Sequence, residues 1–73
     1  MAATTTETRA QILAAGKMAL LDSGYAGLST RRVADAAGVP LSQIHYHFGS
    51  RQNLVLAVLE EENARLLLSL IHI

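Results

Sequence analysis

Histidine, serine and tyrosine side chains gather between Ser42 and His47, and these residue types can bind metals, act as nucleophiles or make polar contacts. A shared metal ion is disfavoured because His45 and His47 are two residues apart, which separates them by roughly 200° on a helix. His72 is remote in sequence, and no carboxylate stands at ligand spacing. Ser42 and His45 could touch on a helix, but no acidic residue lies near to orient the imidazole and no oxyanion loop is evident. We therefore expect no metal site, no cofactor and no enzyme activity.

Recognition of DNA suits this stretch better. Residues 41–47 offer hydroxyl, amide and imidazole groups, and they include no acidic side chain that phosphates would repel. Groups of this kind hydrogen-bond to base edges in the major groove, where Gln43 can bond bidentately to adenine. Tyr46 and His47 can donate to phosphate oxygens. The stretch is therefore a candidate recognition helix.

Ile44, Phe48 and Arg51 complete this stretch. Ile44 and Phe48 are four residues apart, so both can face inward from one side of a helix. Arg51 is expected in the first turn of the next helix, where backbone N–H groups and the helix dipole favour an anion. We therefore predict that Arg51 clamps a phosphate. The plainer alternative is that Ile44 and Phe48 are core and all other side chains are solvated surface.

Two longer helices are predicted on either side of the short ones. From Thr8 to about Gly24, small and apolar residues recur at helical spacing, and glycine suits the left-handed cap that ends a helix. Ser50 is predicted to cap a last helix. The apolar positions of the first helix are Ile12, Ala15, Gly16, Ala19 and Leu20, and those of the last are Leu54, Val55, Ala57, Val58, Leu59 and Leu66.

Two short helices are predicted between them. Ser29 can cap the helix TRRVADAA, which Gly38 ends. Pro40 suits the first turn of a second short helix that runs to about His47, before Gly49 stops it. Two short helices joined by a tight turn that contains glycine have the shape of a helix-turn-helix.

The predicted fold is therefore all-α, a three-helix bundle with the helix-turn-helix at about residues 29–48, followed by the start of a long fourth helix. Residues 1–5 are expected to be a disordered tail, residues 6–66 the folded domain and residues 67–73 a truncated helix end. A chain of 73 residues without cysteine forms one small domain and has no disulfide.

Charges are sorted along the chain although their formal sum is zero. Residues 1–51 carry five basic and three acidic side chains, whereas residues 52–73 carry one basic and three acidic side chains. This asymmetry hints at a polyanionic partner for the first part. The rival interpretation is a protein-interaction module that docks a partner through Glu60 to Glu62, and its plain alternative is a solvated helix face. No signal peptide or membrane-length apolar run is evident, so we expect a soluble cytoplasmic protein that does not bind membranes.

The segment "ILAAGKMALLDSGYAGLSTRRVADAAGVPLSQIHYHFGSRQNLVLAVLE" resembles the N-terminal DNA-binding domain of TetR-type transcriptional regulators. The resemblance covers about residues 6–66. Its markers are Ile12 with Ala15, Gly24 with Tyr25, Val33 with Ala34, Ala37 to Val39, His47 with Phe48, and Ser50 with Arg51 before Leu54.

This resemblance implies a homeodomain-like head in which the second and third helices form the helix-turn-helix. It also implies a fourth helix that leads to a larger C-terminal helical domain. In most members that domain forms a homodimer and binds a small-molecule effector, which releases a repressor from a palindromic operator in double-stranded DNA. By position, the family's DNA contacts would fall on Thr30, Arg31, Leu41, Ser42, Gln43, His45, Tyr46, His47 and Arg51.

Three residues depart from the family's usual pattern. Pro40 replaces a frequent serine, which removes a side-chain cap but keeps the geometry. Ser42 stands where glycine is commonest and adds a hydroxyl. His45 stands where a tyrosine usually contacts the DNA backbone, and an imidazole is shorter and can become cationic, so its contact should depend on pH.

Regulators of this family are longer than this chain, so we expect the effector and dimerisation domain to be missing. The last six residues, LSLIHI, can be encoded by a sequence resembling a transposon-end adaptor for sequencing libraries, and we hypothesise that residues 68–73 are adaptor read-through. The alternative is an ordinary apolar helix end. Without the dimer domain we expect weak, salt-sensitive DNA binding and an exposed apolar side of the last helix at Val55, Leu59 and Leu66.

Overall fold

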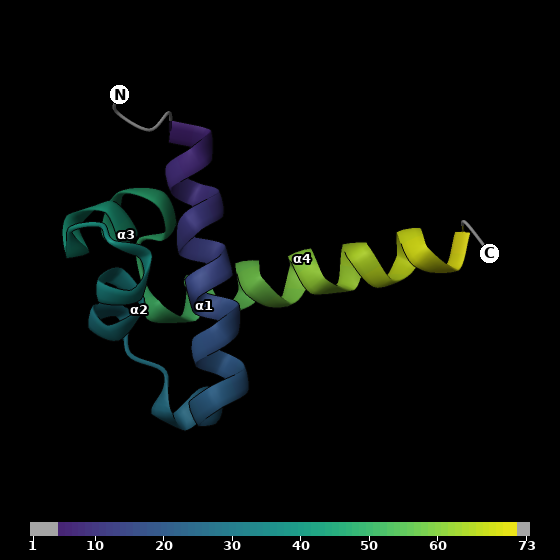
Figure 1. Cartoon of the computed structure of the whole chain (residues 1–73), viewed down its shortest axis with the longest axis horizontal. Coiled ribbons are helices and arrows are strands. Elements are labelled where there is room, and N and C mark those ends of the chain that lie inside the picture. The colour runs from purple at the N-terminus through teal and green to yellow at the C-terminus, as the bar shows by residue number, and fades with distance from the viewer. Residues whose placement is uncertain (1–4, 72–73) are drawn as a thin grey trace.

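The computed structural model describes residues 5–71, which form four α-helices and no strand (Figure 1). α1 spans Thr5–Gly27, α2 spans Thr30–Ala37, α3 spans Leu41–Phe48 and α4 spans Arg51–Ile71. In Figure 1, α1, α2 and α3 gather around the first turns of α4, whose later turns extend away from the bundle. The all-α prediction is therefore confirmed.

α1 is longer than predicted and is kinked near its end. It begins at Thr5 rather than Thr8, so only residues 1–4 of the expected tail lie outside the described residues. At Gly24 the backbone leaves the helical region, with φ 71° and ψ 178°, and the helix then continues to Gly27. Glycine reaches this positive φ at little cost because it has no β-carbon. The predicted break at Gly24 is thus a kink within α1 and not its end.

The two short helices begin and end close to the predicted positions. At the start of α2, the Ser29 hydroxyl oxygen accepts a hydrogen bond from the Arg32 N–H at 3.4 Å. Gly38 closes α2 in the left-handed conformation, with φ 72° and ψ 30°, and this needs a residue without a β-carbon. Pro40 is the residue before the first turn of α3 and not part of that turn. α3 ends at Phe48, one residue later than predicted.

Side-chain caps join α3 directly to α4. The Ser50 hydroxyl oxygen accepts from the Asn53 N–H at 3.1 Å, which confirms the predicted cap of α4. The side-chain Nδ2 of Asn53 in turn donates to the Phe48 carbonyl oxygen at 2.9 Å, so the last carbonyl group of α3 has a hydrogen-bond partner. Gly49 adds a backbone bond from its N–H to the His45 carbonyl oxygen at 3.0 Å. The direction of α3 is therefore tied to the first turn of α4.

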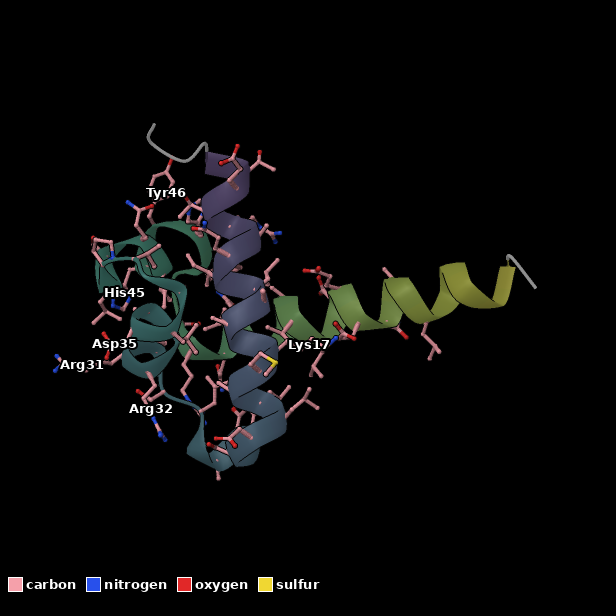
Figure 2. All side chains as sticks on the ribbon, in the orientation of Figure 1. Lys17, Arg31, Arg32, Asp35, His45 and Tyr46 are labelled. Atoms are coloured by element: carbon pink, nitrogen blue, oxygen red, sulfur yellow. The ribbon has the colours of Figure 1, made fainter. Side chains whose placement is uncertain are left out.

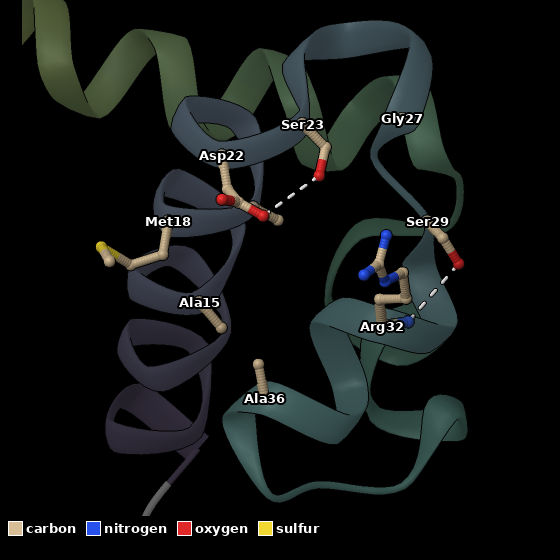
Figure 3. A pocket seen from close by; sticks show the side chains of 9 residues that line it. Ala15, Met18, Asp22, Ser23, Gly27, Ser29, Arg32 and Ala36 are labelled. Atoms are coloured by element: carbon tan, nitrogen blue, oxygen red, sulfur yellow. Dashed lines mark hydrogen bonds between the residues drawn. The ribbon is translucent and has the colours of Figure 1, made fainter.

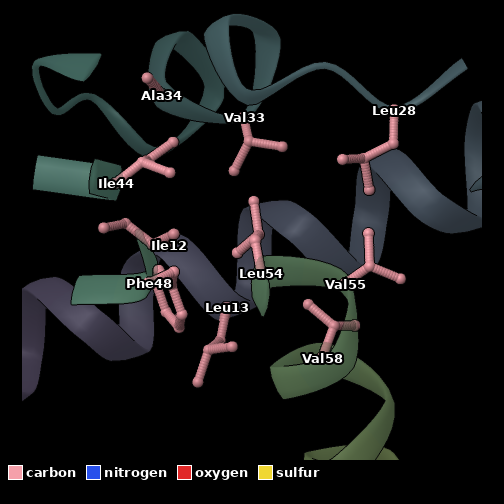
Figure 4. Packing of buried hydrophobic residues seen from close by; sticks show 10 residues of the cluster. All are labelled: Ile12, Leu13, Leu28, Val33, Ala34, Ile44, Phe48, Leu54, Val55 and Val58. Carbon is pink, nitrogen blue, oxygen red and sulfur yellow. The ribbon is translucent and has the colours of Figure 1, made fainter. Parts of the chain in front are cut away.

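The core is built from aliphatic side chains of all four helices, with the ring of Phe48 at one side (Figure 4). Ile44 and Phe48 both lie in this core, as the sequence predicts. The buried residues are Ile12 and Leu13 of α1, Leu28 of the α1–α2 connection, Val33 and Ala34 of α2, Ile44 and Phe48 of α3, and Leu54, Val55 and Val58 of α4.

Two core residues differ from the sequence-based prediction. Leu13 was not predicted to be buried, and Val55 was predicted to be exposed. Val55 is only 3% exposed, although we expected it on the exposed apolar side of α4. The first turns of α4 pack against both α1 and α3, so a wider arc of the helix is buried there than a single stripe predicts. Leu59 and Leu66 are exposed as expected, and Leu56 is a further exposed apolar side chain in the described part of α4.

Gly16 lets α1 and α4 approach closely. A β-carbon at this position would lie 3.0 Å from Cγ2 of Val58 and 3.7 Å from Cδ1 of Leu54. Carbon atoms pack best at about 3.5–4.0 Å, so a larger side chain would force the two helices apart. Next to this contact, Nζ of Lys17 lies 3.2 Å from Oε1 of Glu62 and adds an ion pair between the same helices.

Replacing Gly16 with Leu should destabilise the fold, because Val58 already crowds the position of a β-carbon. Overpacking of this kind typically costs about 1–3 kcal/mol of the free energy of unfolding. Urea denaturation followed by helical circular dichroism measures the loss. Ala14→Leu, at an exposed position of the same helix, is the matched control. Equal stability of the two variants would contradict the close α1–α4 contact.

Candidate nucleic-acid interface

α3 turns one side to the core and the opposite side to solvent. Ile44 and Phe48 fix the inner side, at 0% and 8% exposure. Ser42, His45 and Tyr46 form the exposed outer side, and Tyr46 is 75% exposed. A helix with a slim polar outer side of this kind fits the major groove of DNA.

Leu41, Gln43 and His47 lie at the border between these two sides and are half-buried. Leu41 packs against the core, so only part of its side chain faces outward. The His47 ring packs against Tyr46 and Phe48, with centroid distances of 5.1 Å and 6.1 Å. Its Nε2 atom is shielded from solvent and has no hydrogen-bond partner among the described residues. Nε2 is therefore not presented to a phosphate in this arrangement, and the His47 contact stays a prediction.

The first turn of α2 carries two more of the predicted contacts. Thr30 and Arg31 begin this helix, where the positive end of the helix dipole lies, and Arg31 is exposed. Figure 2 shows Arg31 extending from the bundle on the same side as His45 and Tyr46. The structure thus places these predicted contacts from two helices on one side of the molecule.

Asp35 also lies on this side, and we did not predict it as part of the site. It is exposed, and Figure 2 shows it near His45 and Arg31. The signal in the sequence was its spacing, because residues four apart share one side of a helix. A carboxylate there repels phosphates but can accept a hydrogen bond from the amino group of cytosine.

Arg51 makes contacts within the protein that the sequence did not predict. Its Nε donates to the Leu28 carbonyl oxygen at 2.7 Å, and a terminal nitrogen donates to the Tyr25 carbonyl oxygen. The guanidinium carbon also lies 4.4 Å from the centroid of the Tyr25 ring. The arginine therefore ties the first turn of α4 to the end of α1. A phosphate would have to bind its remaining N–H groups or displace these bonds, and the clamp stays a prediction.

A pocket of about 300 Å³ opens between α1 and α2 (Figure 3). Arg32 lines this pocket, so its side chain is directed differently from that of Arg31. The hydroxyl of Ser23 donates to the Asp22 carboxylate at 3.4 Å, and no described residue that lines the pocket is a histidine. The pocket therefore offers no serine–histidine pair.

Two further observations concern the described residues as a whole. Within residues 5–71, no three histidine or acidic side chains come together in a group that could hold a metal ion. His72, the third histidine of the sequence, lies outside the described residues. None of the helices in residues 5–71 has both the length and the apolar character that a membrane crossing requires.

Comparison with a protein-family model shows which proteins this chain is related to. Residues 12–58, more than half of the chain, match the model for bacterial regulatory proteins of the tetR family. The chain belongs to this family. The resemblance inferred from the sequence is therefore confirmed, and the matched segment runs from the second turn of α1 to the buried part of α4.

Individual tetR-family relatives agree with this assignment. The chain is 36% identical over 61 residues to the HTH-type transcriptional repressor AcnR of Corynebacterium glutamicum, covering 84% of this chain and 32% of that protein. It is 39% identical over 54 residues to the HTH-type transcriptional regulator TtgR of Pseudomonas putida, covering 74% and 26%. The HTH-type transcriptional activator FasR of Mycolicibacterium smegmatis is also 39% identical over 54 residues, covering 74% and 25%. The chain thus spans about a third or less of the length of these curated relatives.

Replacing Arg51 with Lys should lower stability, because an ammonium keeps the charge but cannot reproduce the planar fork that holds two carbonyl oxygens. Hydrogen bonds from charged groups contribute about 1.5–3 kcal/mol, and the partial exposure of Arg51 reduces the expected loss to roughly 1 kcal/mol. Urea denaturation measures the change, with Arg31→Lys at an exposed position as the control. A variant as stable as the unchanged chain would show that the fork contributes nothing to folding.

Proposed function

We propose that this chain is the DNA-binding domain of a sequence-specific transcriptional regulator and not an enzyme. The observation that carries the proposal is the division of α3. Ile44 and Phe48 hold it in the core, while Ser42, His45 and Tyr46 stand on its exposed side. The second helix of a helix-turn-helix enters the major groove in this orientation, with the first helix across the DNA backbone.

The contacts divide between bases and backbone. Ser42 and Gln43 are short or bidentate polar groups near the start of α3, and they suit base edges. Arg31 and Tyr46 can bond to phosphates on either side of the groove. In the sequence of α3, His45 lies between Gln43, which suits a base edge, and Tyr46, which suits a phosphate.

In the full-length protein, we propose, a homodimer binds a palindromic operator and a small-molecule effector releases it through a C-terminal domain. Family membership and the greater length of the relatives support this. Helix-turn-helix dimers bind half-sites about 34–36 Å apart, which one copy of this domain cannot span. α4 extends out of the bundle in Figure 1 and is the segment that would lead to such a domain. Repression is proposed because AcnR, which is similar over 84% of this chain, is a transcriptional repressor.

A protein-interaction module built on the acidic stretch of α4 is less well supported. Glu62 already pairs with Lys17 of α1 within the chain. The acidic stretch therefore contributes to the junction of α1 and α4, and no observation favours an external basic partner.

Binding of this chain to random duplex DNA tests the proposal. Non-specific binding by a single domain should have a dissociation constant of about 10⁻⁴–10⁻⁶ M at physiological salt. The logarithm of the affinity should fall linearly with the logarithm of salt concentration, because bound basic groups release counterions. Fluorescence anisotropy over about 50–200 mM salt measures both quantities. No binding at the lowest salt, or an affinity that salt leaves unchanged, would contradict the proposal.

Replacing Gln43 with Ala should alter which sequence is preferred, because Gln43 is placed to bond to a base. The loss should be roughly 1–3 kcal/mol at a site selected by the unchanged chain from a random library. Competition binding with selected and random duplexes measures it. Gln52→Ala removes the same side chain from an exposed position of α4 and is the matched control. If both variants keep the original preference, Gln43 does not read a base.

A further inference from the structure

Arg9 brings a cationic side chain from α1 to the end of α3. Its guanidinium carbon lies 5.3 Å from the centroid of the Phe48 ring, and Phe48 is the last residue of α3. Arg9 is exposed, so this contact leaves the charge accessible to solvent. Our sequence-based set of DNA contacts contains no residue of α1.

The position of Arg9 complements that of Arg31. Figure 2 shows Tyr46 beside the N-terminal part of α1, and His45 and Arg31 follow along the same side of the molecule. Arg9 contacts the end of α3 that lies near α1, whereas Arg31 stands on α2. Arg9 of α1 thus lies against the last residue of α3, while Arg31 of α2 is exposed on the side of His45 and Tyr46.

A helix seated in the major groove has a phosphate backbone on each side, because the groove is about 12 Å wide. Arg31 can contact one backbone, and a second basic group would add a charged contact to the other backbone beside Tyr46. Arg51 is a weaker candidate for this second contact, since its donors already bond to carbonyl oxygens of Leu28 and Tyr25. The contact between Arg9 and Phe48 engages the aromatic ring and involves no hydrogen bond.

The surroundings of Arg9 favour an anion. Arginine combines contact with an aromatic ring and planar bonding to phosphate better than lysine does. Glu7 is the nearest acidic residue in the sequence, and its position two residues earlier separates it from Arg9 by roughly 200° around α1. The ring of Phe48 is held in the core at 8% exposure, so the Arg9 guanidinium packs against a side chain whose position is fixed.

We propose that Arg9 is a DNA-phosphate contact, made from α1 to the backbone next to the C-terminal end of α3. This inference rests on the proposed DNA-binding function. It extends the interface from the two helices of the helix-turn-helix to the first turns of α1. Since phosphates are the same at every base pair, the contact adds affinity without sequence preference.

The test compares Arg9→Gln with Lys17→Gln, two variants that each remove one positive charge from α1. Lys17 pairs with Glu62, and Figure 2 shows it next to α4, away from α3. Binding to two unrelated duplexes is measured across a salt series. Arg9→Gln should weaken binding to both duplexes equally and reduce the slope of log affinity against log salt by about one. Lys17→Gln should leave the slope unchanged.

Arg9→Lys keeps the charge and should keep the slope, which separates a phosphate contact from a purely structural role of Arg9. Circular dichroism confirms that each variant is folded, and Arg9→Lys also serves if Arg9→Gln is not. The inference is overturned if Arg9→Gln keeps the slope, if Lys17→Gln reduces it equally, or if Arg9→Lys loses it. In each of these cases the unchanged chain still binds DNA. Absence of binding by the unchanged chain would instead overturn the proposed function itself.

Discussion

An α-helix of eight residues does not persist in water on its own, so the orientation of α3 depends on how Ile44 and Phe48 are anchored in the core. With these two side chains inward, the helical period leaves Ser42 and Tyr46 on the opposite side and His45 at its flank. The side-chain amide of Asn53 donates to the last carbonyl oxygen of the helix, which would otherwise lack a partner within the helix. The exposed side chains contribute nothing to this anchoring. They can therefore differ from protein to protein at little cost to the fold.

The same dependence extends to α4, which helps to position α3 through its own contacts with α1 and α3. Arg51 bonds to the end of α1, and Gly16 of α1 accepts the close approach of Val58. These two contacts constrain α4 differently. The hydrogen bonds of Arg51 fix the direction in which α4 leaves the end of α1, whereas the packing at Gly16 fixes the distance between α1 and α4. The ion pair of Lys17 with Glu62 is more than a third exposed and adds little. A displacement of α4 would therefore strain the fork and the packed contact as well as the bond from Asn53 to the end of α3.

What the sequence could predict depended on how far apart the interacting groups are along the chain. The caps at Ser29 and Ser50 each join residues three apart, so a short pattern sufficed to find them. The bond from Arg51 to Leu28 spans 23 residues, and no local pattern reveals it. Val55 was misplaced for the same reason, because its burial depends on two helices packed against α4. The exposure of Ser42, His45 and Tyr46 was predicted correctly since two large apolar residues mark the inner side of α3, whereas Leu41, Gln43 and His47 of the predicted outer side are half-buried. Whether these exposed groups contact DNA is a separate question that exposure does not answer.

The formal net charge is zero, but the electrostatic potential at each point of the surface depends on the charges nearest to it. Charges interact strongly only within about 8–10 Å at physiological salt, so a phosphate near Arg31 responds to its immediate neighbours. Glu62 pairs with Lys17, which Figure 2 places across α1 from His45 and Arg31, and its charge does not act at the interface. Asp35, by contrast, lies on the same side as Arg31 and His45. Its carboxylate opposes the attraction of any phosphate, whereas an amino group of a base can satisfy it. A single acidic residue there should therefore weaken non-specific binding more than specific binding, and so raise the selectivity that a weakly charged domain can reach.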